Sequence, residues 1–466
     1  MRLFNRYFSS FDLLLVLGDF LLTIGATSLV RWGAFVYSDS FGKGDWSVWF
    51  THSLGMAAVI VISFYYSDLY AIDQTLSDRE LILRFIGGLG VACVVIGAIS
   101  YPIPNFGKTV YLSEIVVLGI VLGLWRIGLM RVIGQAPIHA KVLVVGIQEI
   151  GKIVAEELWK KPNLGMEVVG FVASSDGEVT LSFGNPRKKV LPVIATDRIT
   201  AFIEQSGVNR VLLAESSAWP DHLAEGLLAL RTRGIPVEDC HTFYERLVSK
   251  IAIRDLSTDW IVRSGGFRRE PLVLLIKRIL DIVISSMGLV FAAPLALVVA
   301  ILIKLESKGS VFFHQDRVGQ FENIFSLYKF RSMAADAEAT TGPVWATRDD
   351  PRVTRIGRLM RKLRIDEIPQ MYNVLKGDMS FVGPRPERPF FVKTLKARIP
   401  FYDLRHSVKP GVTGWAQISC NYGDSEAGAV EKLQYDLYYI KHMNVLFDLQ
   451  IIFESLKVVL LGKGAQ

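Results

Sequence analysis

Four long apolar stretches near the start of this chain restrict its fold more than any other feature. They lie at 13–30, 47–66, 85–103 and 111–133. Each is close to the roughly 20 residues that a helix needs to cross the hydrocarbon core of a bilayer. We therefore expect a domain of four transmembrane helices over residues 1–136.

The charged residues around these stretches predict their orientation. Positive charge precedes the first stretch, at Arg2 and Arg6, and closes the fourth, at Arg126, Arg131 and Lys141. The positive-inside rule then places both flanks in the cytoplasm. Because further spans follow the first one, no cleavable signal peptide is expected. Asp19 lies inside the first span, and we interpret it as a carboxylate satisfied by a partner rather than as a functional group.

Length and composition agree with a membrane protein of several domains. The chain has 466 residues, of which 51% are hydrophobic. Its mean hydropathy is +0.34, and the excess of hydrophobic residues lies before residue 134. Its net charge of +7 accumulates near the membrane segments and near one acidic pair, so phosphate is a better partner than nucleic acid. Three distant cysteines exclude a disulfide framework and a zinc spacing.

A small parallel α/β domain is predicted over residues 137–256. Short β-branched runs alternate there with helical segments, at 141–146, 168–173, 210–214 and 235–238. The first run ends in Gly146-Ile147-Gln148-Glu149-Ile150-Gly151, in which Gln148 replaces the middle glycine of the dinucleotide fingerprint. We therefore expect a degenerate Rossmann-like domain without a bound dinucleotide. A polar tract at 257–270 is expected to be a linker into the last domain, 271–466.

The last domain opens with an apolar run that resembles a fifth span. Ile282–Ile303 carries no charge, yet Pro294 interrupts it and basic residues flank both of its ends. We therefore predict a re-entrant helix hairpin over 277–304 that enters and leaves one leaflet. Lys277 and Arg278 are expected to pair with Asp281 on one helix face. The backbone groups that the bend frees are expected to bond to Ser285 or Ser286.

A basic stripe then leads into two adjacent carboxylates, Asp366 and Glu367. The stripe supplies six cations, Arg352, Arg355, Arg358, Arg361, Lys362 and Arg364. This arrangement suits a diphosphate substrate, because cations neutralise its oxygens while one carboxylate attacks phosphorus and the other helps to hold a metal. Pro369 predicts a helix N-terminus at the pair. Further on, Pro384-Arg385-Pro386 forms a rigid turn that presents an arginine.

These motifs resemble a known family. The segments KRILD, HQDRVG, YKFRSM, DPRVTRIGR, RKLRIDEIPQMYNVLKGDMSFVGPRPE and KPGVTGWAQ are similar, in this order, to those of the monotopic phosphoglycosyl transferases. With its four spans and α/β domain, the whole chain resembles the large polyprenyl glycosylphosphotransferases that start exopolysaccharide synthesis. One departure is Arg364-Ile365, where many members have Ser-Leu before the acidic pair.

The resemblance implies a role for each motif residue. Asp366 would be the nucleophile, Glu367 its partner, and both would hold Mg²⁺. Pro384 and Pro386 match the active-site loop, and Lys277, Arg278, Asp281 and Pro294 match the membrane hairpin. We expect five cations to bind substrate phosphate: Lys329, Arg331, Arg358, Arg361 and Arg385.

The implied fold is a membrane protein with four N-terminal transmembrane helices, a cytoplasmic Rossmann-like α/β domain and a mainly α catalytic domain. The implied activity is undecaprenyl-phosphate hexose-1-phosphate transfer in the bacterial inner membrane. Asp366 would attack a UDP-sugar and release UMP, and undecaprenyl phosphate would then take the sugar-phosphate. Membrane lipid is a further partner, nucleic acid is not, and a homodimer is left open.

Two other functions deserve comparison. An oxidoreductase or epimerase acting on nucleotide sugars is suggested by the α/β domain and by Tyr372 and Lys376, which have the spacing of a short-chain dehydrogenase pair. That pair, however, follows the glycine turn by over 220 residues, beyond the predicted hairpin. A non-catalytic membrane scaffold would need no acidic pair beside a cationic stripe. The transferase therefore explains more residues than either alternative, although no motif identifies the sugar.

Overall fold

The computed structural model describes most of the chain in two compact units. The described residues are 2–3, 6–7, 10–37, 46–67, 69–70, 78–100, 108–133, 140–161, 164–182, 188–214, 221–253, 256–267, 270–333, 350, 352–420 and 425–461. The units divide inside one helix, between Phe243 and Tyr244. The predicted domain boundary at 136/137 lies outside the described residues.

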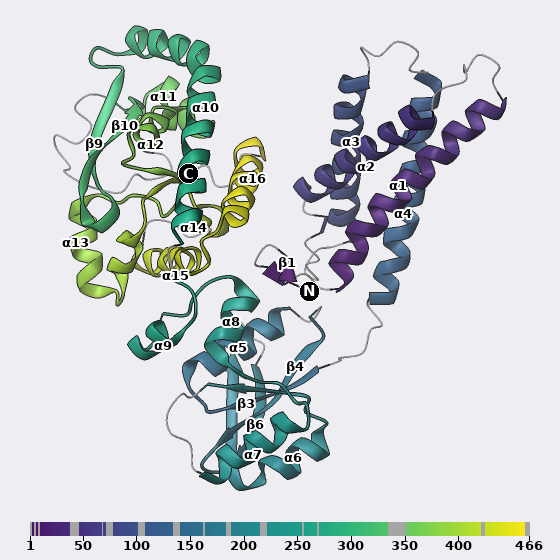
Figure 1. Cartoon of the computed structure of the whole chain (residues 1–466), viewed down its shortest axis with the longest axis vertical. Coiled ribbons are helices and arrows are strands. Elements are labelled where there is room, and N and C mark those ends of the chain that lie inside the picture. Colours follow the sequence, from purple (N-terminus) through teal and green to yellow (C-terminus); the bar gives the residue numbers. More distant parts are fainter. Residues whose placement is uncertain are drawn as a thin grey trace. The chain divides into compact units, whose positions relative to one another are not determined.

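The N-terminal unit begins with two short strands and four long helices (Figure 1). Their bounds are β1 Arg2–Leu3, β2 Arg6–Tyr7, α1 Ser10–Tyr37, α2 Trp46–Tyr66, α3 Asp78–Ser100 and α4 Lys108–Ile133. Segments of α1, α3 and α4 are long and apolar enough to cross a membrane, and α2 contributes a shorter apolar helix, Phe50–Tyr66. Their outward leucines and valines are exposed, as expected for helices surrounded by lipid rather than water. The protein is therefore a membrane protein.

Two buried ion pairs lie inside the four-helix domain. Asp19 is fully buried and accepts hydrogen bonds from Arg126 at 2.5 Å and from the Tyr70 hydroxyl at 2.9 Å. Arg31 pairs with the fully buried Glu114 at 2.6 Å. Charged groups in an apolar surrounding need such partners. The partner predicted for Asp19 is therefore observed, with both bonds on the one oxygen Oδ2.

The rest of the N-terminal unit is a six-stranded sheet in the order β5-β6-β4-β3-β7-β8. Only β5 runs antiparallel to its neighbour, and the five parallel strands have the order of a Rossmann fold. Helices α6 and α7 pack on one face through Leu143 and Val145, and α5 lies on the other side of the sheet (Figure 1). The elements are β3 Ala140–Val145, α5 Glu149–Lys160, β4 Met166–Ala173, β5 Gly177–Ser182, β6 Lys188–Ala195, the 3₁₀ turn Thr196–Arg198, α6 Ile199–Ser206, β7 Arg210–Leu213, α7 Asp221–Thr232 and β8 Val237–Asp239.

The glycine turn after β3 serves packing. A Cβ added at Gly151 would lie 2.9 Å from Val144 Cγ1 and 3.1 Å from Ala214 Cβ, so this glycine allows α5 to approach the sheet closely. Gln148 precedes α5, and its side chain makes no capping hydrogen bond. The turn thus keeps the packing glycine of the fingerprint and lacks the glycine that would admit a pyrophosphate.

The C-terminal unit is mainly helical and carries two pairs of short strands. Helix α8 (Cys240–Val248) crosses the division between the units, and the later elements are α9 Thr258–Arg263, α10 Pro271–Glu306, β9 Phe312–Val318, η3 Gln320–Glu322, β10 Ile324–Phe330, α11 Arg355–Lys362, η4 Ile365–Glu367, α12 Gln370–Lys376, β11 Ser380–Val382, α13 Pro389–Arg398, η5 Tyr402–Ser407, β12 Gly411–Thr413, α14 Trp415–Ser419, α15 Glu426–His442 and α16 Val445–Leu461. Strands β9 and β10 form an antiparallel hairpin, and β11 and β12 pair in parallel.

The segment before α9 belongs to the hydrophobic core of the C-terminal unit. Ile251, Ile253 and Leu256 pack with Trp415 and the aromatic residues of α15. The Trp415 indole donates to the Ser249 carbonyl at 2.8 Å. The core of this unit therefore begins before the predicted linker at 257–270, and that linker contains a short helix, α9.

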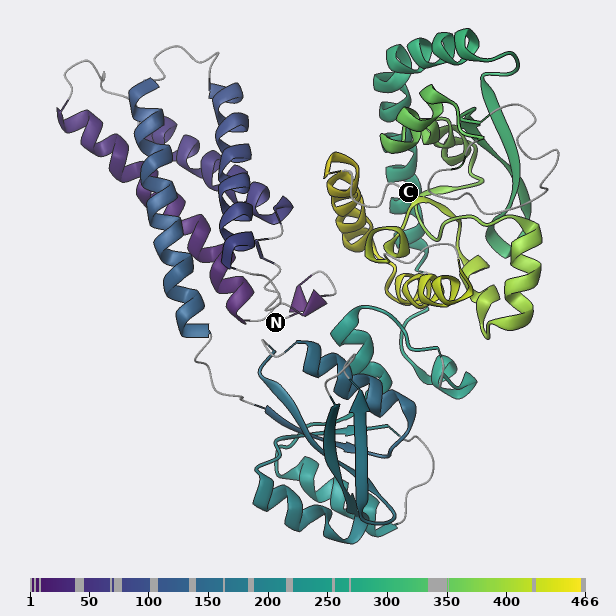
Figure 2. The same ribbon diagram turned by 180° about the vertical axis from the view of Figure 1, so that it is seen from behind.

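Helix α10 contains Pro294 but is not interrupted by it. Figures 1 and 2 show one continuous helix that bends and then runs across the top of the same unit. Its first arm packs on α12 and β11, and Val299 and Ile303 of its second arm pack against Phe330 and Met360. Between the arms the side chains point outward, and Phe291 is 76% exposed.

The predicted pairing inside the first arm is wrong. Lys277 donates to Asp448 at 2.7 Å and to the Val382 carbonyl at 2.9 Å. Arg278 donates to the carbonyls of Val374 and Leu375 at the end of α12. Asp281 accepts from Ser380 Oγ and from the Phe381 amide at 3.0 and 2.8 Å. Partners on other elements therefore replace the local helical pair.

The predicted role of the two serines is also not observed. The Ser285 hydroxyl is fully buried and has no hydrogen-bond partner among the described residues, while Ser286 is exposed. The bend in α10 is therefore supported by packing of its two arms.

Candidate active site

The acidic pair lies in a tight turn between α11 and α12. Thr354 caps the N-terminus of α11, and its hydroxyl accepts from the Gly357 amide at 2.9 Å. After α11, Arg364 adopts a left-handed conformation with φ 52°, which is uncommon for a residue other than glycine. This reversal leads into η4, which contains both Asp366 and Glu367 and immediately precedes the short helix α12. The predicted position before a helix is confirmed.

Glu367 is the buried centre of a group of cations. It accepts from Lys329 of β10 at 3.0 Å and from Arg385 at 2.8 Å, and Arg364 lies 3.5 Å away. Burial alone would raise the pKa of Glu367, but the three positive charges hold it well below its usual range. Glu367 is therefore an ionised carboxylate that holds cations in place.

Asp366 lies beside this group and has a different environment. It is buried, with 7% of its surface exposed, and no hydrogen bond of its carboxylate is seen among the described residues. Burial raises the pKa of Asp366, Glu367 adds to the rise, and the charges of Lys329, Arg361 and Arg385 oppose it. The carboxylate is thus close to cations but free to react.

The basic stripe divides into two groups. Arg361 faces the pair, since its charge acts on Asp366 and its Nε donates to Ser332 Oγ at 3.0 Å. Arg364 contacts Glu367 as described above. Arg355, Arg358 and Lys362 are exposed on α11. Arg358 is therefore a solvated residue here, without a described contact to the acidic pair.

Arg331 does not reach the acidic pair. Its terminal nitrogens donate to the carbonyls of Ser307 and Lys308 at 2.8 and 2.9 Å. Only 7% of its surface is exposed. These bonds connect the end of β10 to the end of α10, and the phosphate contact of Arg331 stays a prediction.

The loop that carries Arg385 is packed against strand β12. A Cβ added at Gly383 would lie 2.5 Å from the Lys409 carbonyl oxygen, so only glycine allows the two backbones to approach. Both Pro384 and Pro386 are buried. The KPGVTGWAQ segment therefore forms the wall behind this loop.

Asn373 supports the site from α12. It is fully buried, its Oδ1 accepts from the Tyr328 amide at 3.0 Å, and its Nδ2 donates to the Ser326 carbonyl at 2.8 Å. These bonds fix β10, and with it Lys329, beside η4.

The Tyr372 and Lys376 pair is not a dehydrogenase site. Tyr372 is exposed, and Lys376 pairs with Asp378 at 2.9 Å. Both lie on α12 in the C-terminal unit, whereas the Rossmann-like sheet belongs to the N-terminal unit.

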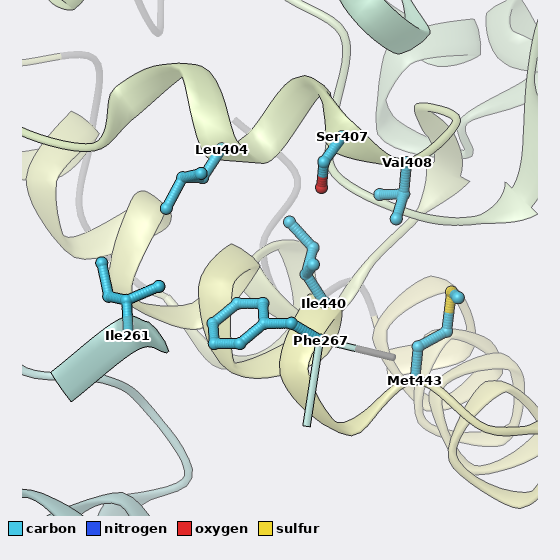
Figure 3. A pocket seen from close by; sticks show the side chains of 7 residues that line it. All are labelled: Ile261, Phe267, Leu404, Ser407, Val408, Ile440 and Met443. Carbon is cyan, nitrogen blue, oxygen red and sulfur yellow. The ribbon is translucent and has the colours of Figure 1, made fainter. Parts of the chain in front are cut away.

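An apolar cavity of about 200 Å³ lies elsewhere in the C-terminal unit (Figure 3). It is lined by Ile261, Phe267, Leu404, Ser407, Val408, Ile440 and Met443. Its lining contains one hydroxyl and no charged residue, so it lacks the groups that phosphate chemistry requires.

The described residues contain no cluster of three or more acidic, histidine or cysteine side chains that would hold a metal alone. Magnesium, however, is usually bound by one or two carboxylates together with substrate phosphates. Asp366 and Glu367 are adjacent and buried, and the Asp366 carboxylate is free. This donor set fits Mg²⁺ that binds together with a diphosphate substrate.

Comparisons with known proteins agree with this site. A profile of the bacterial sugar transferase family matches residues 272–462. The UDP-N-acetylgalactosamine-undecaprenyl-phosphate N-acetylgalactosaminephosphotransferase of Aeromonas hydrophila is 42% identical over 53% of this chain and 57% of its own length. The UDP-glucose:undecaprenyl-phosphate glucose-1-phosphate transferase of Xanthomonas campestris pv. campestris is 28% identical over 97% of this chain and 94% of its own length.

A third relative matches less than half of this chain with nearly its whole length. The exopolysaccharide production protein PSS of Rhizobium leguminosarum bv. phaseoli is 40% identical over 41% of this chain and 98% of its own length. The matched profile contains α10, the acidic pair and the Arg385 loop. The chain therefore belongs to the bacterial sugar transferase family, the polyprenyl-phosphate sugar-1-phosphate transferases that its motifs resemble.

Proposed function

We propose that this protein transfers a sugar-1-phosphate from a UDP-sugar to undecaprenyl phosphate and so starts exopolysaccharide or capsule synthesis. The names of its relatives support the substrate classes, since they act between UDP-sugars and undecaprenyl phosphate. The relatives differ in the sugar, which is N-acetylgalactosamine in one and glucose in the other. The proposal therefore names a UDP-hexose or UDP-N-acetylhexosamine as the class of donor.

The observation that carries the mechanism is the unequal environment of the two carboxylates. Glu367 already accepts bonds from Lys329 and Arg385 on one oxygen, Oε1, and Arg364 lies 3.5 Å from the other. Asp366 is buried beside the same cations with its carboxylate free. A carboxylate that is desolvated and free of hydrogen bonds is a better nucleophile than one held by cations. Asp366 is therefore the nucleophile, and Glu367 positions the cations.

The reaction has two displacements at one phosphorus atom. A carboxylate oxygen of Asp366 forms a bond to the β-phosphorus of the UDP-sugar, the bond to the bridging oxygen breaks, and UMP leaves with that oxygen. An oxygen of undecaprenyl phosphate then attacks the same phosphorus and releases the Asp366 carboxylate. The product is an undecaprenyl diphosphate sugar.

The cations around Asp366 are suited to stabilise the negative charge on the phosphoryl group in both steps. Lys329, Arg361 and Arg385 lie around Asp366, where they balance the charge on the phosphoryl oxygens. Asp366 and Glu367 would hold Mg²⁺ together with the diphosphate, and the ion would neutralise charge on the leaving phosphate.

Helix α10 is proposed to be a re-entrant membrane helix. Near its start, Asp281 bonds to Ser380 and Phe381. At its end, Glu306 accepts from the Arg355 and Ile356 amides at 2.8 and 3.2 Å. Both ends thus contact one globular unit, while the residues between them are apolar and exposed. A helix that crossed the bilayer would separate its ends, so α10 enters and leaves the cytoplasmic leaflet of the inner membrane.

A transfer assay tests this proposal. Purified protein is incubated with undecaprenyl phosphate and radiolabelled UDP-glucose, UDP-galactose or a UDP-N-acetylhexosamine, and the lipid is extracted. We expect label in the lipid phase with one class of donor and release of UMP in equal amount. Absence of labelled lipid with every donor, from a folded protein supplied with magnesium, would contradict the proposed function.

A further inference from the structure

The loop that presents Arg385 is held at four consecutive carbonyl groups. The Pro384 carbonyl accepts from the Gly411 amide at 2.9 Å, and the Glu387 carbonyl accepts from the Val318 amide at 2.9 Å. Between them, the Arg385 carbonyl accepts from Arg405 at 3.0 Å. The Pro386 carbonyl accepts from Arg317 at 3.0 Å. Two backbone donors and two guanidinium groups therefore hold this one short segment.

These bonds fix the backbone angles that proline leaves free. Each residue has two soft angles, φ and ψ, because the peptide bond is planar. Proline fixes φ at Pro384 and Pro386. The orientation of each peptide plane sets the remaining ψ, and a hydrogen bond to the carbonyl holds that plane. Arg405 and Arg317 thus determine how the backbone on either side of Pro386 is turned.

The side chain of Arg405 is held in place by further partners. It is buried, donates to the Tyr402 hydroxyl at 2.7 Å and forms an ion pair with Asp436 at 2.9 Å. Asp436 is itself 1% exposed. Its carboxylate balances the guanidinium, so Arg405 has no free charge for a substrate.

Stability alone does not explain why Arg405 and Asp436 form a buried ion pair. The desolvation of both charges offsets most of their attraction, and apolar residues of similar size often stabilise a core equally well. The distinctive contribution of Arg405 is its bond to the Arg385 carbonyl. The pair therefore holds one backbone group in one orientation.

We propose that Arg405 and Arg317 are positioning residues for transfer, which act by aiming Arg385 at the reacting phosphate. Arg385 bonds to Glu367 at 2.8 Å, and 40% of its side chain remains open to a ligand. This inference rests on the proposed function, in which Arg385 contacts the diphosphate of the donor. Misplacing a catalytic group by about 1 Å costs roughly a hundredfold in rate, so control of this loop has a measurable effect.

A double-mutant cycle tests the proposal. Arg405→Met and Arg385→Ala are made separately and together in the full-length protein, and kcat/KM for the UDP-sugar is measured. We expect Arg405→Met alone to lower kcat/KM by roughly tenfold to a hundredfold, from the loss of a charged hydrogen bond. In the Arg385→Ala background, the same substitution should change kcat/KM by less than about threefold, because its target is absent. Arg317→Met should behave in the same way.

Arg331 provides the matched control. It is a buried arginine that also donates to backbone carbonyls, but to those of Ser307 and Lys308 rather than to the loop. The fold reduction in kcat/KM caused by Arg331→Met should therefore be the same in the wild-type and Arg385→Ala backgrounds. If Arg405→Met does not fold, Tyr402→Phe removes one partner of the Arg405 guanidinium and keeps the ring.

The outcomes separate this proposal from the proposed function. If the wild-type protein is active and the fold reductions in kcat/KM from Arg405→Met and Arg385→Ala multiply fully in the double variant, the positioning role alone is overturned. A folded wild-type protein without transfer of any sugar would overturn the proposed function itself.

Discussion

The ion pair between Lys277 and Asp448 gives the sharpest test of how α10 is joined to the catalytic unit. The two side chains are 11% and 5% exposed and lie 2.7 Å apart. Lys277 also donates to the Val382 carbonyl, and the Tyr439 hydroxyl donates to Asp448 at 2.8 Å. Asp448→Ala leaves the buried ammonium group without its counter-charge. Breaking a buried pair in this way costs about 3–5 kcal/mol.

That loss converts into a measurable change in melting temperature. For a unit of this size, 1 kcal/mol shifts the midpoint by about 2–4 °C, so Asp448→Ala should lower it by roughly 6–20 °C. The assay is thermal unfolding followed by tryptophan fluorescence in detergent micelles, at one scan rate for all variants.

Two controls make the result specific. Glu426→Ala breaks the exposed pair between Arg398 and Glu426, whose side chains are 61% and 55% exposed, and should cost about 0–1 kcal/mol. The double substitution Lys277→Met with Asp448→Leu removes both charges and should recover part of the loss. A midpoint for Asp448→Ala within the range of Glu426→Ala would refute the reasoning.

Three further predictions concern pH, truncation and topology. Removing the Arg361 charge by Arg361→Gln should raise the pKa of Asp366 further, because that charge lowers it. Since Asp366 reacts as the carboxylate, the acid limb of the kcat/KM profile against pH should move to higher pH. An unchanged acid limb would contradict this. A chain that begins at Tyr244 should retain transferase activity, because the segment after it supplies core residues; an inactive, folded product would argue against an autonomous catalytic unit. Cysteines introduced by Arg263→Cys and Lys308→Cys, in a chain without its native cysteines, should both resist an impermeant maleimide in intact cells and react after lysis. Labelling of the second site alone from outside would establish a full span of α10.

The sequence predicted the elements whose signals are local. The apolar stretches predicted α1 to α4 to within several residues at most ends, because length and composition determine a membrane helix. The alternation after Lys141 predicted β3, β4, β7 and β8. It missed β6 (Lys188–Ala195), which contains Pro192 and begins with two lysines, both unusual for a strand inside a sheet. The polar edge strand β5 carried no distinct pattern either.

The partners of charged residues were the least predictable part. Helical spacing suggested that Lys277 and Arg278 pair with Asp281, but all three residues have partners on other elements. Lys277 bonds to a buried carboxylate, Arg278 to carbonyls at the end of α12, and Asp281 to a backbone amide. A helix end and a strand edge offer such unpaired groups, and their positions depend on the tertiary fold. Sequence spacing alone cannot reveal them.

The same reason limited prediction of the site. The motif indicated that Asp366 and Glu367 act together, but their different environments arise from Lys329 and Arg385, which come from other elements. Arg331 and Arg358 resembled phosphate ligands because they are basic and lie in the motif. The structure places one on carbonyl groups and the other in solvent.

The central claim is that Asp366 carries the sugar-phosphate during transfer. Intact-protein mass spectrometry tests it directly on full-length protein mixed with magnesium and UDP-sugar, without acceptor. The account predicts an added mass of one sugar-phosphoryl group, equal release of UMP, loss of the added mass when undecaprenyl phosphate is supplied, and no added mass on Asp366→Asn. Substantial turnover by Asp366→Asn, or an active wild-type protein that never carries the added mass in rapid-quench samples, would contradict it.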